Sequence, residues 1–389
     1  MPNNFSKDAE IAMRNSPALL AYLKNKFEVA SLCSPSALTH PAASLIEHVA
    51  TLLISVAQTG YTGTKKSLRF AVAESDSSNA FAYWSEPRND WIVITSGLIE
   101  TLWSESLRLD RLTHALEKDA LGEFPMGATL RSAVSEADPS SSRFRELIFM
   151  SAVAFFVGHE IGHLVDGHAA CYDGPGAYDK SNANDDDPLV TANGDQRRKQ
   201  ALELRADSFG VEYSLKFTLC TVLIPSFKPN LSPDAIASLQ RQAAWIATLG
   251  MSLAMSTIRP VRVDITQHRK PEHPPSAFRA LWLNSRANAN MQEWLPKIDE
   301  RTRQLIAQHA LLQANALTVL PYDETQRCFD GCLSGEDLVR MLNQTGIRRL
   351  IFEDKATGEY VAALRALDAE LHPLLIPRQR RVKWFRTEG

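Results

Sequence analysis

The sequence predicts an α+β protein that is mostly helical and contains a small β-sheet. Two observations support this fold class. Apolar residues recur at helical spacing over most of the chain between residues 17 and 316. In this part of the chain, strand-like patterns are confined to short stretches between residues 67 and 95, which alternate or are rich in β-branched and aromatic residues.

Two helices are expected before the sheet. Ser16 and Pro17 place a capping residue ahead of a proline in the first helical position, so a helix spans Pro17–Phe27. A second helix covers residues 41–57 and stops before Gly60. The expected strands are 67–73, 79–84 and 91–95.

The later part of the chain is predicted to be helical. Two short helices at residues 97–103 and 107–118 follow the sheet. A long helix runs from Arg143 to about Gly167, and its residues 149–157 are apolar on every side, which is typical of a buried helix. Further helices are expected at residues 196–222, 232–258, 276–283 and 291–316. Residues 172–195 are rich in Gly, Asn and Asp and are expected to form a loop.

Composition and termini predict a soluble, cytoplasmic protein. The N-terminus lacks the pattern of a signal peptide, and no stretch is expected to span a membrane, since residues 147–157 and 243–255 are too short. An odd number of cysteines, five, indicates free thiols and a reducing compartment. The net charge of −3 offers no basic field for nucleic acid, and the basic residues 378–386 are interpreted as a solvated tail.

The most informative motif is His-Glu-x-x-His at residues 159–163, inside the long predicted helix. Residues four apart lie on one helix face, so His159 and His163 can bind one Zn²⁺. Glu160 is offset from that face and could act as a general base on a zinc-activated water. Gly162 is unusual in a helix interior, which suggests a close-packing or access requirement. The motif predicts metal-assisted peptide hydrolysis.

A catalytic zinc ion needs a third protein ligand. A third His six residues after His163 would serve, but Ala169 occupies that position. Glu203 on a later helix is the predicted third ligand, and Asp207, one turn further on, would orient a zinc-binding His. The alternative is that both acids belong to a charged helix surface. His168 is rotated away from the ligand face and is interpreted as a His at a helix C-terminus.

The motifs together resemble the gluzincin family of HtpX and the CAAX prenyl proteases over roughly residues 65–285. Four stretches, in the family's order, carry the resemblance: residues 79–82 with 91–98, residues 159–164 with His168, residues 203–207, and residues 273–276 with Arg279. A weaker likeness to the phage-exclusion peptidase Lit rests on the zinc helix alone. Many family members have membrane helices, which are not expected here, so membrane substrates are not inferred.

The resemblance implies a zincin-like metallopeptidase core in which the edge strand of the sheet borders the active-site cleft. The strand formed by Asn79, Ala80, Phe81 and Ala82 would pair with an extended substrate. His273 would act near the site, holding the substrate or the oxyanion; the alternative is an ordinary histidine in a turn. Arg279 is expected to take part in substrate binding. The expected domains are an N-terminal helical region (1–64), a gluzincin-like metallopeptidase domain (65–320) and a small α/β appendage (321–389).

The function predicted for the chain is that of a soluble endopeptidase with one Zn²⁺ per chain and a protein or peptide substrate. His159, His163 and Glu203 would hold the metal, and Glu160 would transfer the proton. The alternative is a protease-like regulatory or partner-binding module that acts on a single protein, in a phage-defence or effector role, and retains zinc mainly for structure. The intact Glu160 favours the enzyme, because a structural site has no use for a base.

Overall fold

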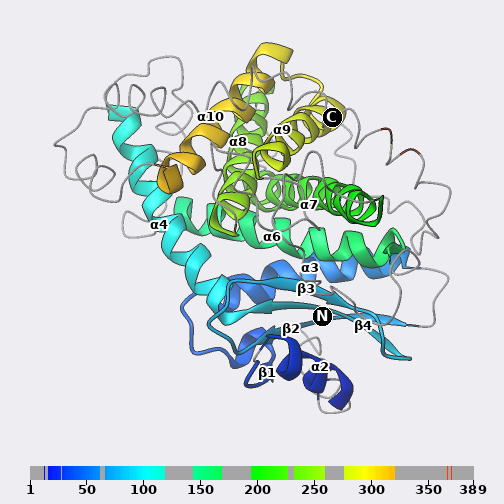
Figure 1. Ribbon diagram of the computed structural model, residues 1–389. Coiled ribbons are helices and arrows are strands. Elements are labelled where there is room, and N and C mark those ends of the chain that lie inside the picture. Colours follow the sequence, from blue (N-terminus) through cyan, green and yellow to red (C-terminus); the bar gives the residue numbers. More distant parts are fainter. Residues whose placement is uncertain are drawn as a thin grey trace.

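The computed structural model describes residues 16–27, 29–61, 66–118, 143–168, 194–226, 232–258 and 276–319, together with Met13, Ala366 and Ala369. Within these ranges the protein is mostly helical and contains one mixed, four-stranded sheet (Figure 1). The prediction of a mostly helical α+β fold with a small sheet is therefore confirmed.

The sheet has the strand order β1-β2-β4-β3. The central pair, β2 and β4, is parallel, while β1 pairs antiparallel with β2 and β3 pairs antiparallel with β4. The four strands are β1 (Leu32–Cys33), β2 (Ser67–Ala73), β3 (Ala80–Tyr83) and β4 (Asn89–Thr95). The short strand β1 was not predicted, because two residues are too few to show a period.

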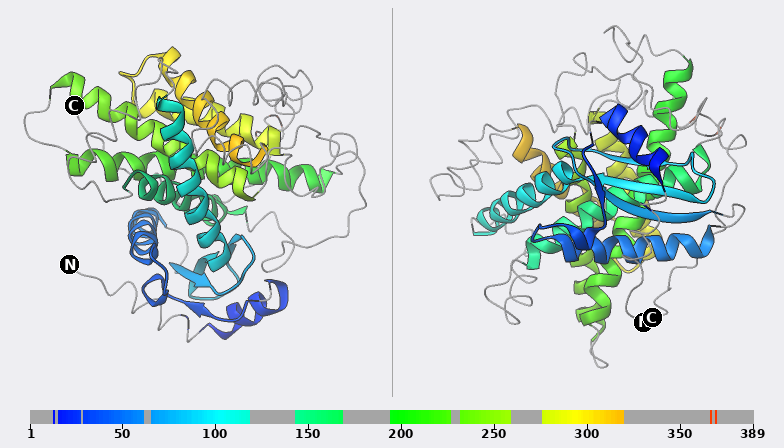
Figure 2. Two further views of the ribbon diagram at one scale, coloured as in Figure 1. Left: turned by 90° about the vertical axis from the view of Figure 1, so that its left-hand side faces the viewer. Right: turned by 90° about the horizontal axis from the view of Figure 1, so that it is seen from below.

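Both faces of the sheet are covered, which explains why β4 is apolar throughout rather than alternating. Ile92 and Ile94 point into the large core that the sheet shares with the helices α3 (Ala43–Gly60) and α6 (Arg143–Val165). Trp91 and Val93 point the other way, into a smaller core closed by α2 (Pro17–Phe27). In Figures 1 and 2 α2 lies on one side of the sheet and α3 and α6 lie on the other.

Several helices surround one central helix, α6. All of its residues from Leu147 to Val165 are buried, and it packs against α3, α4, α7, α8 and the sheet. The helices are α2 (Pro17–Phe27), the 3-10 turn η1 (Pro35–Ala37), α3 (Ala43–Gly60), α4 (Ser96–Lys118), α6 (Arg143–Val165), α7 (Gly194–Ser226), α8 (Pro233–Ile258), α9 (Ser276–Trp294) and α10 (Glu300–Val319).

Glycines allow α6 and α7 to approach each other closely. A Cβ added at Gly158 would lie 2.6 Å from the Cβ of Tyr213, and one added at Gly162 would lie 2.9 Å from the Cβ of Phe209. Neither position has room for a larger side chain without a shift of the helices. The close-packing requirement suggested by Gly162 is thus confirmed, and it brings the face of α7 that carries Glu203 onto the His motif.

Two predicted helix breaks were wrong. The expected break between residues 103 and 107 is absent, since α4 is continuous there, and the hydroxyl of Ser106 donates to the carbonyl of Leu102 (2.6 Å) within it. The expected break after residue 283 is also absent, since α9 continues to Trp294. The chain instead turns between α9 and α10, where Asp299 accepts a hydrogen bond from the backbone N–H of Thr302 (2.9 Å).

The expectation that residues 147–157 are too short to cross a membrane needs correction. They belong to α6, which by length and hydropathy could cross one, although the apolar part of this helix is fully buried within the protein. The absence of a membrane span therefore stays a prediction. The loop at 172–195 and the appendage at 321–389 fall almost entirely outside the described residues, so the division into three domains stays a prediction as well.

Candidate metal centre

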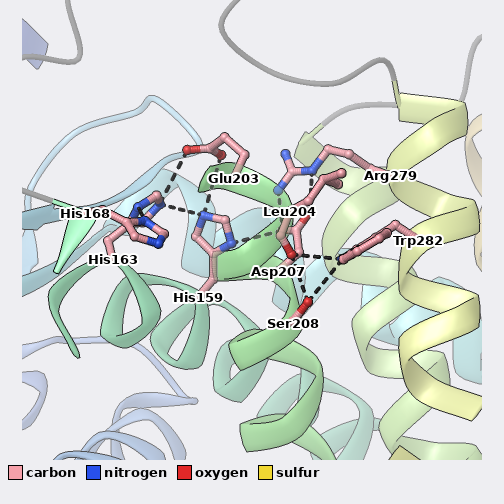
Figure 3. Close-up of polar contacts among 9 residues, drawn as sticks. All are labelled: His159, His163, His168, Glu203, Leu204, Asp207, Ser208, Arg279 and Trp282. Atoms are coloured by element: carbon pink, nitrogen blue, oxygen red, sulfur yellow. Dashed lines mark hydrogen bonds and ion pairs between the residues drawn. The ribbon is translucent and has the colours of Figure 1, made fainter. Parts of the chain in front are cut away.

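The His motif on α6 meets Glu203 on α7 at a buried point between the two helices (Figure 3). The Nε2 atoms of His159 and His163 are 3.2 Å apart. The carboxylate oxygens of Glu203 lie 3.7 Å from His159 Nε2 and 3.4 Å from His163 Nε2. The two histidines and Glu203, which lies 40 positions or more after them in the sequence, thus direct two nitrogens and a carboxylate at one point.

The three donors have the spacing that a tetrahedral zinc ion requires. Zinc–ligand bonds of about 2.0–2.2 Å at tetrahedral angles place neighbouring donor atoms roughly 3.3–3.6 Å apart. The three donor–donor distances observed here, 3.2, 3.4 and 3.7 Å, lie close to that range. Two imidazole nitrogens and a carboxylate are also the donor types that zinc accepts in catalytic sites. The residues therefore fit a zinc ion.

Asp207 contacts the side of the His159 ring that faces away from the candidate metal point. Its Oδ1 lies 2.9 Å from Nδ1 of His159, on the ring edge opposite the candidate metal point. Arg279 on α9 donates two hydrogen bonds to the same carboxylate, with distances of 2.8 and 2.5 Å. Burial alone would raise the pKa of Asp207, but Arg279 and His159 lower it, so this carboxylate is held ionised. Such a partner restrains the ring and its tautomer.

A second chain of contacts reaches the other histidine. The Nδ1 atoms of His163 and His168 are 2.9 Å apart, and Nε2 of His168 lies 3.2 Å from Asp166 Oδ2. Arg205 on α7 donates to both carboxylate oxygens of Asp166, at 2.5 and 3.1 Å. Burial opposes ionisation of Asp166, yet hydrogen bonds from His168 and Arg205 lower its pKa to about 2.

Gly167 is the sequence signal for this second series of contacts. It lies just after the end of α6 and has a positive φ of 76°. A glycine in this conformation reverses the chain at a helix C-terminus. The reversal carries His168 back against the last turn, so its ring contacts His163 rather than solvent.

Glu160 lies beside the three donors and also contacts the sheet. The backbone N–H of Ala82 in β3 donates a hydrogen bond to its carboxylate. The other oxygen, Oε2, is buried and has no hydrogen-bond partner among the described residues. Burial, together with the nearby Glu203, raises the pKa of Glu160 from its ordinary value of 4.5 to about 7, although His159 and the Ala82 N–H act against the rise. A carboxyl of this kind is a candidate general base.

The two histidines of the motif differ in their electrostatics. Burial lowers the pKa of His163 well below its ordinary value, so this ring is neutral and has a lone pair to offer. Burial also opposes charge on His159, but Asp207, Glu160 and Glu203 raise its pKa above the ordinary value. A proton on His159 would therefore compete with a metal ion, and metal binding would displace it.

Residues 40–173 match the model of peptidase family M48. Comparisons with curated proteins and with solved structures gave no match. The match confirms the resemblance to the HtpX and CAAX prenyl protease family, and it supports metallopeptidase activity, since M48 peptidases are metal-dependent.

The M48 segment contains strands β2, β3 and β4 and the His motif but ends before Glu203, Asp207 and Arg279. The structure brings these three residues onto the motif from α7 and α9. Trp282, also outside the matched segment, links α9 to α7, since its Nε1 donates to the carbonyl of Leu204 at 2.8 Å.

The predicted substrate-binding strand in the M48 segment is the last strand of the sheet order, so β3 is an edge among the described residues. Thr95 donates its N–H to the carbonyl of Asn79, which places the backbone groups of Ala80 and Ala82 on the side away from β4. Two contacts agree with this alternation. The side-chain oxygen of Asn79 accepts from the Ala80 N–H at 3.0 Å, and Ala82 donates to Glu160.

Two other predicted site residues have different outcomes. His273 lies outside the described residues, so its role stays a prediction. Arg279 is buried, with its guanidinium on Asp207, so the structure relates it to the orientation of His159. Its expected contact with substrate stays a prediction. Phe81 points into the smaller core, away from the large core that contains α6.

Proposed function

We propose that this chain is a zinc-dependent endopeptidase with a zincin-like core, in which the edge strand β3 borders the active-site cleft. One observation carries the proposal: His159, His163 and Glu203 direct their donor atoms at a single buried point, and Glu160 stands beside it. The M48 match supports the same reaction class. A protein or peptide is the proposed substrate, and the cytoplasm is the proposed location.

The number of protein donors, three rather than four, favours a catalytic zinc site over a structural one. Among the described residues the donor group has three members, and a structural zinc ion takes four protein ligands. A buried carboxylate without a full set of partners, such as Glu160, destabilises a fold and is retained where it has chemical work. Both facts disfavour the alternative of a binding module in which zinc is only structural.

In the proposed mechanism each residue has one task. A zinc ion held by His159, His163 and Glu203 would lower the pKa of a water to about 7 and polarise the substrate carbonyl. Glu160 accepts the proton of that water and delivers it to the nitrogen of the leaving amine. The Ala82 N–H restrains the carboxylate through one oxygen and leaves the other available. An extended substrate would lie along β3 and donate to the outward carbonyls of Ala80 and Ala82, whose N–H groups are already used, so that its scissile bond passes Glu160.

Replacing Glu160 by Gln tests the mechanism. We expect the Glu160→Gln variant to retain one zinc ion per chain but to lose hydrolysis by roughly 10²–10⁴-fold, because the amide cannot accept the proton. Metal content is measured by mass spectrometry, and hydrolysis is measured on casein and on a fluorogenic peptide library.

The matched control is Glu300→Gln, at an exposed position of α10, which should leave both quantities unchanged. Wild-type rates in the Glu160→Gln variant would refute the assignment of the base. A wild-type protein that binds zinc and cleaves nothing in the library or in a proteome digest would refute the endopeptidase.

A further inference from the structure

We propose that His168 is a positioning residue that selects the metal-binding tautomer of His163, under the control of Asp166 and Arg205. The proposal rests on the metal site described above and assigns a new role to three residues outside the ligand set. Their contacts form one unbroken chain from Arg205 on α7, through the turn after α6, to the ring of His163.

The geometry leaves little freedom to the two rings. His163 and His168 are both fully buried, and their ring centroids are 4.9 Å apart with planes nearly perpendicular, at 80°. Their Nδ1 atoms face each other at 2.9 Å, so one nitrogen must carry a hydrogen and the other must accept it. Which of the two is the donor decides whether Nε2 of His163 has a lone pair for a metal.

Asp166 determines which nitrogen is the donor, although it is two hydrogen bonds away from His163. A carboxylate only accepts hydrogen bonds, and Arg205 keeps this one ionised, so Nε2 of His168 must be the donor at 3.2 Å. A neutral His168 with its hydrogen on Nε2 has a lone pair on Nδ1. The facing Nδ1 of His163 therefore carries the hydrogen, and its Nε2 presents a lone pair toward Glu203 and His159.

The opposite assignment of the hydrogens fails at both ends of this series of contacts, at Asp166 and at His163. If His168 donated from Nδ1, its Nε2 lone pair would face the carboxylate of Asp166 with no hydrogen between them. The hydrogen of a neutral His163 would then lie on Nε2, where it blocks a metal ion. The arrangement of Arg205, Asp166 and His168 thus admits the metal-binding tautomer and disfavours the other.

The two candidate histidine ligands are supported by different series of hydrogen-bonded residues. His159 contacts the carboxylate of Asp207 directly, and Arg279 neutralises that carboxylate. His163 contacts a neutral imidazole, and the arginine–carboxylate pair lies one residue further out. The second chain orients the ring without placing another carboxylate directly on a metal ligand.

A pair of substitutions at residue 168 separates positioning from packing. His168→Asn places an amide oxygen near the position of Nδ1 and can still accept from His163, whereas His168→Leu fills the space and accepts nothing. We expect His168→Leu to weaken zinc binding by about 10–100-fold and His168→Asn to recover most of the loss. Zinc affinity is measured by competition with a chromogenic chelator, which does not depend on turnover.

The visible spectrum of the cobalt-substituted protein is a second readout. The ligand-field bands should shift in His168→Leu and return toward those of the wild type in His168→Asn. If His168→Leu does not fold, His168→Gln replaces it, because the longer side chain places its amide near Nε2 and leaves the Nδ1 position without an acceptor.

Wild-type zinc affinity and cobalt bands in the Leu or Gln variant would overturn the proposal. Equal losses in the Asn variant would also overturn it, because they would show that the imidazole matters only for packing. The outcome is independent of the proposed endopeptidase, since a failure of the wild-type protein to cleave peptides would leave these metal-binding results unaffected.

Discussion

At the scale of single residues, Glu160 shows how a candidate catalytic group opposes folding. Its carboxylate is buried, and one of its oxygens has no hydrogen-bond partner among the described residues. Burial and the nearby Glu203 favour the protonated form, which raises the pKa of Glu160 from 4.5 to about 7. A carboxyl whose pKa is higher in the folded state lowers stability as the pH rises above its unfolded value, and the full cost is present above the folded value.

This cost predicts that Glu160→Gln stabilises the metal-free protein, and that the gain in stability depends on pH. Between pH 5 and pH 8 the stability of the variant relative to the wild type should rise by about 2 kcal/mol, because the neutral amide has no charge to bury. Urea unfolding in the presence of a chelator measures the difference at each pH. The exposed Glu300→Gln control should show no such trend, and a constant difference for Glu160→Gln would contradict the prediction.

At the scale of elements, the candidate site depends on how closely α6 and α7 pack. Gly158 and Gly162 have neighbours on α7 within 3 Å of where a Cβ would lie. In an ordinary helix interior, replacing Gly by Ala stabilises by about 1 kcal/mol. Here the added methyl group meets the Cβ of Tyr213, which is fixed to the backbone and cannot swing away.

We therefore predict that Gly158→Ala destabilises the protein by roughly 1–3 kcal/mol despite the gain in helix propensity. The free energy of unfolding is measured by urea denaturation at pH 7. Ser104→Ala, at an exposed position of α4, is the control and should be neutral or slightly stabilising. An increase in stability for Gly158→Ala would show that the two helices can separate without cost.

At the scale of the whole molecule, the candidate metal site joins parts that are distant in the sequence. α6 supplies the His motif, α7 supplies Glu203 and Asp207, and α9 adds Arg279 behind them. β3 contributes the Ala82 N–H to Glu160. A ligand that binds only the folded state stabilises it by mass action, so a metal ion held between α6 and α7 should stabilise their packing.

Zinc removal should therefore lower the melting temperature, and added zinc should restore it. A free zinc concentration of about 1,000 times Kd would contribute roughly 4 kcal/mol. Glu203→Gln should lose most of this response, because an amide is a poor zinc ligand. Glu212→Gln, on the same helix but paired with Lys216 away from the site, should keep the full response. A zinc-dependent shift in Glu203→Gln equal to that of the wild type would exclude this residue as a ligand.

The sequence by itself determined what depends on local periodicity. The 3.6-residue period places His159 and His163 on one face of a helix, and the strand-like patterns located β2, β3 and β4 to within two residues. Glu203 and Asp207 could be proposed because both lie one turn apart on a helix, but their distance from the motif could not be derived.

Only the tertiary structure decided how the elements meet. The close packing at Gly158 and Gly162 brings Glu203 to the histidines, and the chain reversal at Gly167 turns His168 onto His163. The order of the strands, which leaves β3 at an edge next to Glu160, also depends on contacts between distant segments. Local periodicity orients side chains within one element, whereas distances between elements follow from the packing of the whole core.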